Sequence, residues 1–336
     1  MKAAVIRQHG EIEDITFETD WPDPKPGDGE VVLKVGACAL NYHDLFTLKG
    51  MPGIKIGFPL IMGIDVAGTI AEIGAGVTGW QVGDRVVIDP IDRDKPGLIG
   101  ETRDGGLAEY VAVRASQLVK LHDDIDFATA AALPCAYGTA HRMMITRGKI
   151  AAGEKVLILG ASGGVGTCCV QLAKAAGAEV VATASSRSKL DRLAELGADH
   201  LINYAETDFM REVYGIYGKP KVYGGGGVDV IVNFTGGDTW VKSLRSLTKD
   251  GRMLTCGATA GFDPQTDIRF IWTFEQNIIG SNGWEMSDID ALLAMVQAGK
   301  LSALIDCELP LEETQTAFQL LRDRKVFGKV IVRPGE

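Results

Sequence analysis

The segment from Lys155 to Asn203 constrains the fold of this chain more than any other stretch. It opens with an apolar run of branched residues, 155–160, which has no polar face and therefore predicts a buried parallel strand. A glycine-rich turn follows, and then a helical pattern that ends at Gly177, a residue suited to a left-handed backbone. A second apolar strand, 179–184, comes next. This order predicts an α/β domain with a parallel sheet.

The glycine-rich turn predicts a dinucleotide-binding site. Glycine lets the backbone approach a pyrophosphate, and the N-terminus of the following helix directs free N–H groups and a partial positive charge at it. The alternative is a tight turn in an α/β domain that binds no nucleotide. The residues that we expect to contact the cofactor here are Gly160, Ser162, Gly163, Gly164 and Val165.

The end of the second strand indicates which dinucleotide binds. An acidic residue there would accept a hydrogen bond from a ribose hydroxyl group. The chain instead offers hydroxyl groups and two cations, which suit a 2′-phosphate, so the sequence favours NADPH over NADH. The alternative is ordinary solvated charge at the start of a helix. The residues concerned are Ser185, Ser186, Arg187 and Lys189.

The pattern of predicted strands, helices and turns divides the chain into two domains. Residues 1–124 contain short strands separated by Gly, Pro and Asp turns, which predicts a β-rich domain. Residues 125–287 alternate helices with apolar strands and predict a doubly wound sheet of six parallel strands, with a helical connector broken near Pro134. The tail, 288–336, is expected to fold back onto the β-rich domain. Four consecutive glycines, 224–227, predict a flexible loop before a strand.

The overall charge and the cysteine content exclude several classes of protein. The net charge of −10 argues against nucleic acid or an anionic membrane as a partner and leaves a small-molecule substrate. The N-terminus begins directly as a strand, so we expect neither a signal peptide nor a membrane span. The six cysteines have no regular spacing and predict reduced thiols in a cytoplasmic protein.

Several motifs resemble those of the medium-chain dehydrogenase/reductase superfamily, over the whole chain. The resemblance implies a GroES-like catalytic domain over 1–124, completed by 288–336, and a Rossmann domain over 125–287. It also implies a homodimer, or a tetramer, whose subunits pair through the strand around Ile278. The motifs are Asn41-Tyr42-His43-Asp44-Leu45 with Gly50, Gly63 to Gly68, Val82 to Val86, Gly105 to Tyr110 and the glycine-rich turn.

The metal positions of that superfamily decide which branch this chain resembles. Zinc-dependent members begin with Cys the motif that here begins with Asn41, and they have His where this chain has Ile64. A cysteine-rich lobe should also precede the Gly105 motif, but residues 92–98 contain no cysteine. The resemblance therefore predicts no zinc, as in quinone oxidoreductase-like members. The alternative is an unusual site built from the side chains of His43, Asp65 and Cys135.

The quinone oxidoreductase-like branch also supplies expected roles for individual residues. Asn41 matches an asparagine beside the nicotinamide, and Lys189 and Tyr204 match contacts to the 2′-phosphate. Two departures weaken the likeness of the substrate pocket, because Phe46 and Leu48 stand where those relatives have tyrosine and arginine. After two later strands, Thr235 and Gly257 complete the expected cofactor-binding residues.

Chemistry without a Lewis acid favours a conjugated alkene over a simple ketone as the substrate. Reduction of a ketone forms an alkoxide, which lacks strong stabilisation without a metal. Reduction of a conjugated alkene forms an enolate, which needs only hydrogen-bond donors and a proton source. We expect Tyr42 and His43 to donate, with Asn41 positioning the nicotinamide or substrate. The alternatives are a structural histidine and a tyrosine packed in the core. Aromatic residues that are expected to line the substrate pocket, the core or a dimer interface are Trp272, Phe274 and Trp284.

Three functional hypotheses follow from the sequence. The leading one is an NADPH-dependent, zinc-independent reductase of activated C=C bonds in enones or quinones. The second is a metal-free alcohol or carbonyl dehydrogenase that uses His43 as its acid/base. The third is a crystallin-like protein that binds NADPH without turnover. The sequence leaves the substrate open, and an acyl-CoA would need a cationic rim that the sequence alone does not assemble.

Overall fold

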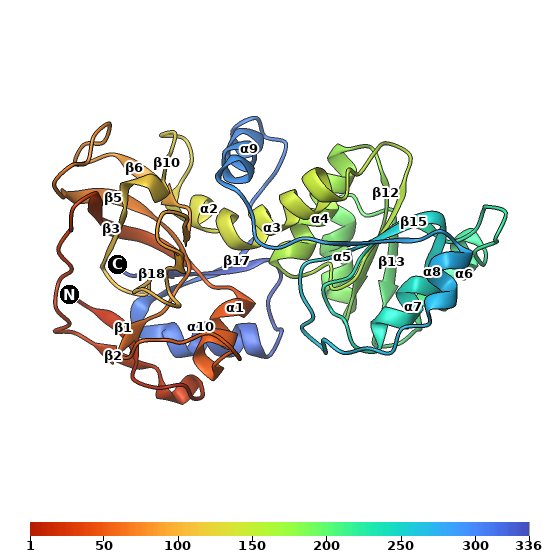
Figure 1. Ribbon diagram of the computed structural model, residues 1–336, viewed down its shortest axis with the longest axis horizontal. Helices are drawn as coiled ribbons and strands as arrows, with labels where there is room; N and C mark the ends of the chain where they lie inside the picture. Colours follow the sequence, from red (N-terminus) through yellow and green to blue (C-terminus); the bar gives the residue numbers. More distant parts are fainter. Residues whose placement is uncertain (336) are drawn as a thin grey trace. The chain divides into compact units, whose positions relative to one another are not determined.

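The computed structural model describes residues 1–335 and divides the chain into two compact units (Figure 1). A β-rich unit comprises residues 1–136 and 289–336, and an α/β unit comprises residues 137–288. The division falls inside the helical connector, whereas the sequence analysis placed the boundary between residues 124 and 125. The first connector helix, α2 (Phe127–Ala131), packs on the β-rich unit, where Gly36 leaves room for the ring of Phe127.

The β-rich unit is built on a seven-stranded sheet with two smaller sheets beside it. In the large sheet, the strands are ordered β10-β6-β5-β3-β18-β17, and β9 also pairs with β3. Their bounds are β3 (Glu30–Ala39), β5 (Asp65–Ile73), β6 (Arg85–Ile88), β9 (Tyr110–Arg114), β10 (Leu118–Lys120), β17 (Ile305–Pro310) and β18 (Lys329–Arg333). The smaller sheets contain β1 (Ala3–Ile6), β2 (Thr16–Glu18) and β4 (Leu60–Ile61), and the hairpin of β7 (Ile91–Asp92) and β8 (Gly97–Leu98).

The C-terminal tail returns to the β-rich unit, as predicted. Strand β18 pairs antiparallel with β3, with Val332 opposite Cys38, and β17 runs parallel to β18 at the edge of the sheet. Helix α10 (Thr314–Arg322) packs against α1 (Tyr42–Lys49) and buries Phe318 in the core (Figure 1). The tail therefore supports the segment between β3 and α1, which carries the candidate catalytic residues.

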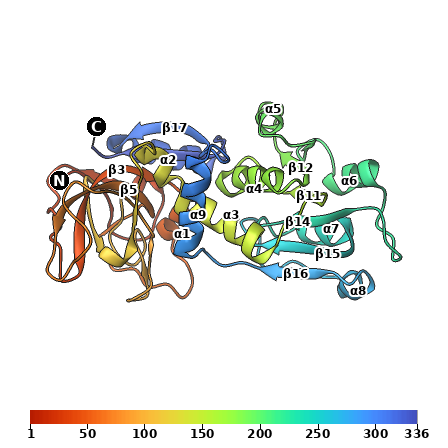
Figure 2. The ribbon, with the colours of Figure 1, turned by 90° about the horizontal axis from the view of Figure 1, so that it is seen from above.

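The α/β unit contains the predicted doubly wound sheet, with six strands that are all parallel. The order is β13-β12-β11-β14-β15-β16, and α4 lies on the opposite face from α6 and α7 (Figure 2). The strands are β11 (Lys155–Ile158), β12 (Glu179–Ala184), β13 (His200–Asn203), β14 (Val228–Val232), β15 (Leu247–Thr255) and β16 (Asn277–Gly280). The helices are α4 (Gly164–Ala175), α5 (Arg187–Glu195), α6 (Phe209–Tyr217), α7 (Thr239–Ser246) and α8 (Ile268–Thr273), and α9 (Met286–Gln297) follows β16.

Two irregular segments have clear backbone causes. The connector widens into π-helical turns at Leu133–Tyr137 and Arg142–Arg147, around α3 (Gly138–His141), and Pro134 has no N–H with which to continue an α-helix. In the glycine run 224–227, all four residues have positive φ, and a Cβ on Gly226 would lie 2.2 Å from the Lys219 carbonyl oxygen. The run therefore forms a close turn that only glycine fits.

Within residues 1–335, every helix is too short or too polar to span a bilayer.

Candidate cofactor and catalytic sites

The glycine-rich turn after β11 has the backbone geometry that a pyrophosphate requires. Gly160 adopts a φ of 65°, and a Cβ on Gly166 would lie 2.5 Å from the Gly160 carbonyl oxygen, so both positions require glycine. Gly163 is the N-cap of α4 and provides no side-chain acceptor for the first N–H groups of this helix. A Cβ on Gly163 would meet only one atom, at 3.9 Å. These residues therefore fit the phosphates of a dinucleotide.

The structure brings the predicted cofactor-binding residues to one edge of the sheet. The parallel strands pair in near-matching register, so their carboxyl ends meet at this edge. An open α/β sheet binds its ligands there. The residues that follow five of the strands are Gly160 after β11, Ser185 after β12, Tyr204 after β13, Thr235 after β14 and Gly257 after β15.

Asn233, a residue that was not among those predicted from the sequence, shapes the turn after β14. This side chain is fully buried, and its Oδ1 accepts hydrogen bonds from the N–H groups of Thr235 and Gly236. Its Nδ2 donates to Ser243 Oγ at 3.0 Å. The sequence feature that could have indicated this role is a polar residue at the end of an apolar strand. Asn233 therefore holds the predicted cofactor contact Thr235 in place.

The segment after β12 carries the charges that favour a 2′-phosphate. Ser186 is the N-cap of α5, and its hydroxyl accepts a hydrogen bond from the Lys189 N–H. The Arg187 side chain is exposed, but its Nε lies 2.8 Å from Asp191 Oδ1, a partner that the sequence analysis missed. Tyr204 is 44% exposed. Asp191 neutralises part of the charge on Arg187, and Arg187 and Lys189 both stay candidates for phosphate recognition.

We expect Lys189→Ala to lower the preference for NADPH over NADH about 10- to 100-fold, because one charge-assisted hydrogen bond contributes roughly 1.5–3 kcal/mol. Arg187→Ala should also lower this preference, by an amount that the ion pair with Asp191 reduces. Calorimetric titration of each variant with both cofactors measures the preference. Lys219→Ala, an exposed lysine in the same unit, is the matched control. Equal losses of NADPH and NADH affinity would contradict the assignment.

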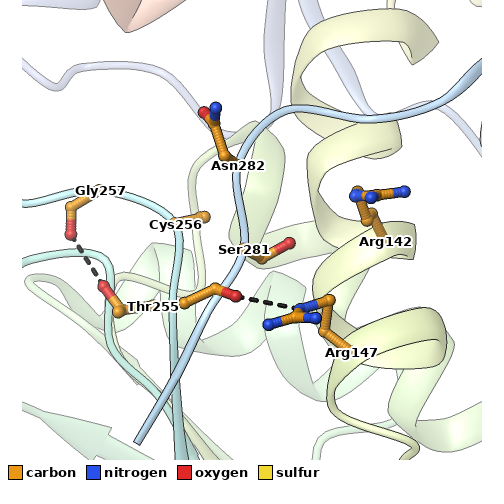
Figure 3. Close-up of a pocket in the computed structure, with 8 residues that line it drawn as sticks. Arg142, Arg147, Thr255, Cys256, Gly257, Ser281 and Asn282 are labelled. Atoms are coloured by element: carbon orange, nitrogen blue, oxygen red, sulfur yellow. Dashed lines mark hydrogen bonds between the residues drawn. The ribbon is translucent and has the colours of Figure 1, made fainter.

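A cavity of about 570 Å³ lies at the carboxyl ends of β15 and β16 (Figure 3). Arg147 Nε donates a hydrogen bond to the Gly280 carbonyl oxygen at 3.1 Å, and Ser281 Oγ is buried without a hydrogen-bond partner within residues 1–335. Two guanidinium groups therefore line a cavity next to Gly257, and that of Arg142 also lies 3.5 Å from Glu285 Oε1 and 3.8 Å from Asp288 Oδ2. The lining residues are Arg142, Arg147, Thr255, Cys256, Gly257, Gly280, Ser281 and Asn282.

The predicted aromatic residues of the α/β unit have different environments. Trp284 is buried, and a Cβ on Gly138 would lie 3.0 Å from its side chain, so Trp284 belongs to the packed interior. Phe274 stacks on Phe270 with ring centroids 6.0 Å apart. Trp272 on α8 is 69% exposed. Of the three, only Trp272 presents a largely exposed aromatic surface.

The predicted catalytic residues of the β-rich unit lie at the start of α1. Asn41 is the N-cap, and Asp44 Oδ2 accepts a hydrogen bond from the Asn41 N–H at 2.7 Å, which fixes the first turn. Tyr42 packs against the β-rich core, and its ring meets Phe46 edge to face. His43 lies in the same turn and is half-buried. The helix start therefore holds Tyr42 and His43 on a rigid support.

Asn41 belongs to a buried network that also contains Asp65 and Lys329. Lys329 Nζ donates to Asn41 Oδ1 at 2.5 Å and to Asp65 Oδ2 at 3.4 Å. Asn41 Nδ2 donates to Asp65 Oδ2 at 2.8 Å, and the Cys135 N–H donates to Asp65 Oδ1 at 2.9 Å. Both polar atoms of the Asn41 side chain are thus engaged inside the unit. That Asn41 also lies beside a nicotinamide stays a prediction.

The donor atoms at this position do not fit a catalytic zinc ion. Such a site needs three thiolate, imidazole or carboxylate ligands around an open position. Here an ammonium group, Lys329 Nζ, binds the Asp65 carboxylate, and the neighbouring Ile64 is apolar. The alternative site of His43, Asp65 and Cys135 is not assembled, and no cluster of three potential metal ligands occurs within residues 1–335.

An ionic network holds the segment in which zinc-dependent relatives carry their cysteine-rich lobe. Asp92 is buried in the β7–β8 hairpin, and its Oδ1 accepts hydrogen bonds from the N–H groups of Asp94 and Lys95. Its Oδ2 lies 3.0 Å from a guanidinium nitrogen of both Arg103 and Arg114. Charge pairing and backbone hydrogen bonds therefore stabilise this hairpin. The six cysteines form no disulfide bond within residues 1–335; Cys38, Cys168 and Cys169 are buried, and Cys135, Cys256 and Cys307 are half-buried.

His43 has a carboxylate partner that the sequence analysis missed. His43 Nε2 lies 2.6 Å from Glu101 Oε2, and the Glu101 side chain is 8% exposed whereas that of His43 is 33% exposed. Burial lowers the pKa of His43, but the hydrogen bond to Glu101 and the charges of Asp44 and Glu101 raise it by more, so the pKa lies above its ordinary value. No local pattern in the sequence links these two residues.

Comparison with known proteins identifies the family of the chain. Residues 27–123 match the alcohol dehydrogenase GroES-like domain, and residues 164–298 match the zinc-binding dehydrogenase family. Together with the two units and the cofactor-binding turn, these matches show that the chain belongs to the medium-chain dehydrogenase/reductase superfamily. It is therefore an oxidoreductase of a superfamily that typically uses a nicotinamide cofactor.

Individual relatives cover nearly the whole chain. Acryloyl-coenzyme A reductase of Sulfurisphaera tokodaii is 32% identical over 99% of this chain and 100% of its own. Human quinone oxidoreductase is 28% identical over 99% of this chain and 97% of its own. A crystal structure of an NAD-dependent alcohol dehydrogenase, 32% identical, superposes with a TM-score of 0.92 over 100% of both chains. These names span alkene, quinone and alcohol chemistry.

Proposed function

We propose that the chain is an NADPH-dependent, zinc-independent reductase of activated C=C bonds in enones, quinones or related α,β-unsaturated carbonyl compounds. The observation that carries this proposal is the buried network of Asn41, Asp65 and Lys329. An ammonium group binds the carboxylate there, which leaves no set of ligands for a Lewis-acid metal. The substrate must then be one whose reduction needs only a hydride, hydrogen-bond donors and a proton.

The chain supplies the proton and the binding groups for such a reaction. When bound, the reduced cofactor would supply a hydride to the β-carbon of the substrate. The glycine-rich turn and the N-terminus of α4 would hold its phosphates, and Lys189 its 2′-phosphate. His43 provides an imidazole whose pKa is raised by Glu101 and Asp44, so it stays a proton donor to a higher pH than an isolated histidine. Tyr42 is the second hydrogen-bond donor of the proposal.

The names of two relatives support this substrate class. Acryloyl-coenzyme A and quinones both contain a C=C bond conjugated to a carbonyl group, and the chain matches a reductase of each over 99% of its length. Arg142 and Arg147 line the cavity beside Gly257, and guanidinium groups suit the phosphates of coenzyme A. Glu285 and Asp288 neutralise part of the charge on Arg142, so Arg147 is the principal group for such a phosphate. Enoyl thioesters of coenzyme A are therefore the first substrates to assay.

The test compares alkene reduction, alcohol oxidation and cofactor binding on the purified chain. With NADPH and a panel of enoyl thioesters, enones and quinones, we expect the absorbance of the reduced cofactor to fall. Incubation with a zinc chelator should leave this rate unchanged. Formation of reduced cofactor from NADP and alcohols, without alkene reduction, would favour a metal-free dehydrogenase that uses His43. Tight cofactor binding without either reaction would favour a crystallin-like role.

We also propose that the chain forms a cytoplasmic homodimer through β16. This strand is at the edge of the parallel sheet, and Ile278 on it is 40% exposed. Exposed apolar side chains also lie on the neighbouring α8, at Ile268 and Trp272. An unpaired apolar edge strand is a ready partner for a second copy of itself.

Ile278→Lys is expected to convert the dimer to a monomer, because a charge on an edge strand opposes pairing between strands. Ultracentrifugation measures the mass in solution. The control is Ile216→Lys, which places the same charge on an exposed position of α6. A variant at position 278 that remains dimeric, or a wild-type monomer, would contradict the proposed interface.

A further inference from the structure

We propose that Glu101 is the positioning residue for His43, holding the imidazole so that Nδ1 delivers the proton that completes reduction of the substrate. This inference rests on the proposed function, since it needs a reaction in which a proton follows the hydride. It adds a residue from a different part of the chain to the site, because Glu101 follows β8 whereas His43 is on α1.

The geometry determines which imidazole nitrogen can act. A carboxylate only accepts hydrogen bonds, so the 2.6 Å contact with Glu101 Oε2 requires a proton on His43 Nε2. Nδ1 has no hydrogen-bond partner within residues 1–335, and one third of the His43 side chain is exposed. Nε2 is therefore the anchored nitrogen, and Nδ1 is the nitrogen that can meet a substrate.

The support for this orientation is rigid on both sides. The Glu101 side chain is buried, and its segment is anchored because the Glu101 N–H donates to the Leu98 carbonyl oxygen. On the other side, the bond between Asp44 and the Asn41 N–H fixes the first turn of α1. A carboxylate that binds one ring nitrogen fixes both the tautomer and the ring direction, which is the usual means of orienting a catalytic histidine.

The charged groups around His43 both raise its pKa. Glu101 contacts the ring directly, and Asp44 adds a negative charge from the same helix. Asp44 is fully buried, one of its oxygens has no hydrogen-bond partner within residues 1–335, and burial raises its pKa to about 6. Both carboxylates favour the imidazolium form, so His43 stays protonated to a higher pH than an isolated histidine.

The proton transfer balances without a further reactant. The imidazolium starts with protons on both nitrogens, and the Nδ1–H bond breaks as a bond forms between that proton and the enolate carbon. The electron pair of the Nδ1–H bond stays on the ring, which becomes a neutral imidazole with Nε2–H still bound to Glu101. Water then returns a proton to Nδ1. Glu101 neither gains nor loses a proton in this step.

The first test needs no substrate. The pKa of His43 is measured by NMR titration of its ring protons in the full chain, with His43→Gln identifying the signal among the five histidines. Glu101→Gln keeps the shape and a hydrogen-bond acceptor but removes the charge, and we expect it to lower this pKa by about one unit. Glu101→Asp should retain most of the raised value, and Glu72→Gln, on an exposed residue of β5, should retain all of it.

The second test uses the pH profile of alkene reduction. Since the protonated imidazole is the active form, the rate falls as pH rises through the pKa of His43. In Glu101→Gln, this alkaline limb should move toward acid by about one unit, with kcat reduced and KM little changed. A double variant with His43→Gln should be no slower than His43→Gln alone, because Glu101 acts through His43.

The outcomes separate the inference from the proposed function. A lowered pKa together with a shifted profile supports the inference. An unchanged pKa in a folded Glu101→Gln variant, or a lowered pKa with an unshifted profile, overturns it. If the wild type reduces no member of the panel, the proposed function fails instead, and the NMR titration still reports whether Glu101 positions the ring.

Discussion

Replacing His43 by glutamine is expected to lower kcat for alkene reduction by about 10²–10⁴-fold, the usual contribution of a general acid. Glutamine preserves a hydrogen-bond donor of similar length but cannot deliver a proton. Stopped-flow measurement of cofactor oxidation with an enoyl thioester provides the rate. NADPH affinity should stay near the wild-type value, because the residues expected to hold the cofactor are in the α/β unit.

The matched control for this variant is His122→Gln. His122 is an exposed histidine of the same unit, and its backbone carbonyl oxygen, which the substitution preserves, accepts a bond from Arg85. Its activity should equal that of the wild type. If His43→Gln retains full activity across the pH range, the proton comes from another group, and Tyr42 becomes the next candidate donor.

Removing the buried ammonium group by Lys329→Met is expected to destabilise the chain by about 3–5 kcal/mol, the usual cost of leaving a buried charge unpaired. Lys329 is 3% exposed, and its partner Asp65 is fully buried. Methionine fills much of the volume, so the loss comes mainly from the ion pair and from the bond to Asn41. Urea denaturation measures the free energy of unfolding.

The pH dependence of this loss has a definite sign. Burial raises the pKa of Asp65, while the charge of Lys329 and the hydrogen bonds from Asn41 and Cys135 lower it. Without Lys329 the folded-state pKa rises further above the unfolded value, so protonation relieves the unpaired charge in acid. The stability that protonation supplies is lost as pH rises through the folded-state pKa. The destabilisation should therefore grow from acidic to alkaline conditions.

Two further variants make this prediction specific. Lys34→Met, on an exposed position of β3, should change stability by less than about 0.5 kcal/mol. Asp65→Asn combined with Lys329→Met should recover part of the loss, because the second substitution removes the unpaired charge. A single Lys329→Met variant as stable as the control would show that the pair contributes little to folding.

The fold was predictable because each element has a local signal. The uninterrupted apolar run of β11, the glycines after it and the positive φ at Gly177 follow from rules that act over a few residues. The return of the tail to the β-rich domain was expected from the sequence, whereas the pairing of β18 with β3 was not predicted. The boundary between the units was harder to predict from the sequence, because the packing of Phe127 against Gly36 joins residues far apart in the chain.

The candidate site also has one part that was predictable from local sequence and another that depends on residues far apart in the chain. The glycine-rich turn that is proposed to bind the cofactor could be recognised because its residues follow one another along the chain. The partners of the candidate catalytic residues could not, since Glu101 lies 58 positions from His43 and Lys329 lies 288 positions from Asn41. Asp191, which pairs with Arg187, is only one helical turn away, and an i, i+4 charge pattern would have revealed it.

The sequence by itself determined the family, the doubly wound sheet and the position of the glycine-rich cradle, because these depend on short patterns of apolar residues and glycine. Only the tertiary structure decided what surrounds Asn41 and His43. A buried polar group is stable only with partners, and those partners are supplied by whichever strand or loop the fold brings alongside. Here the fold supplies an ammonium group to Asn41 and a carboxylate to His43.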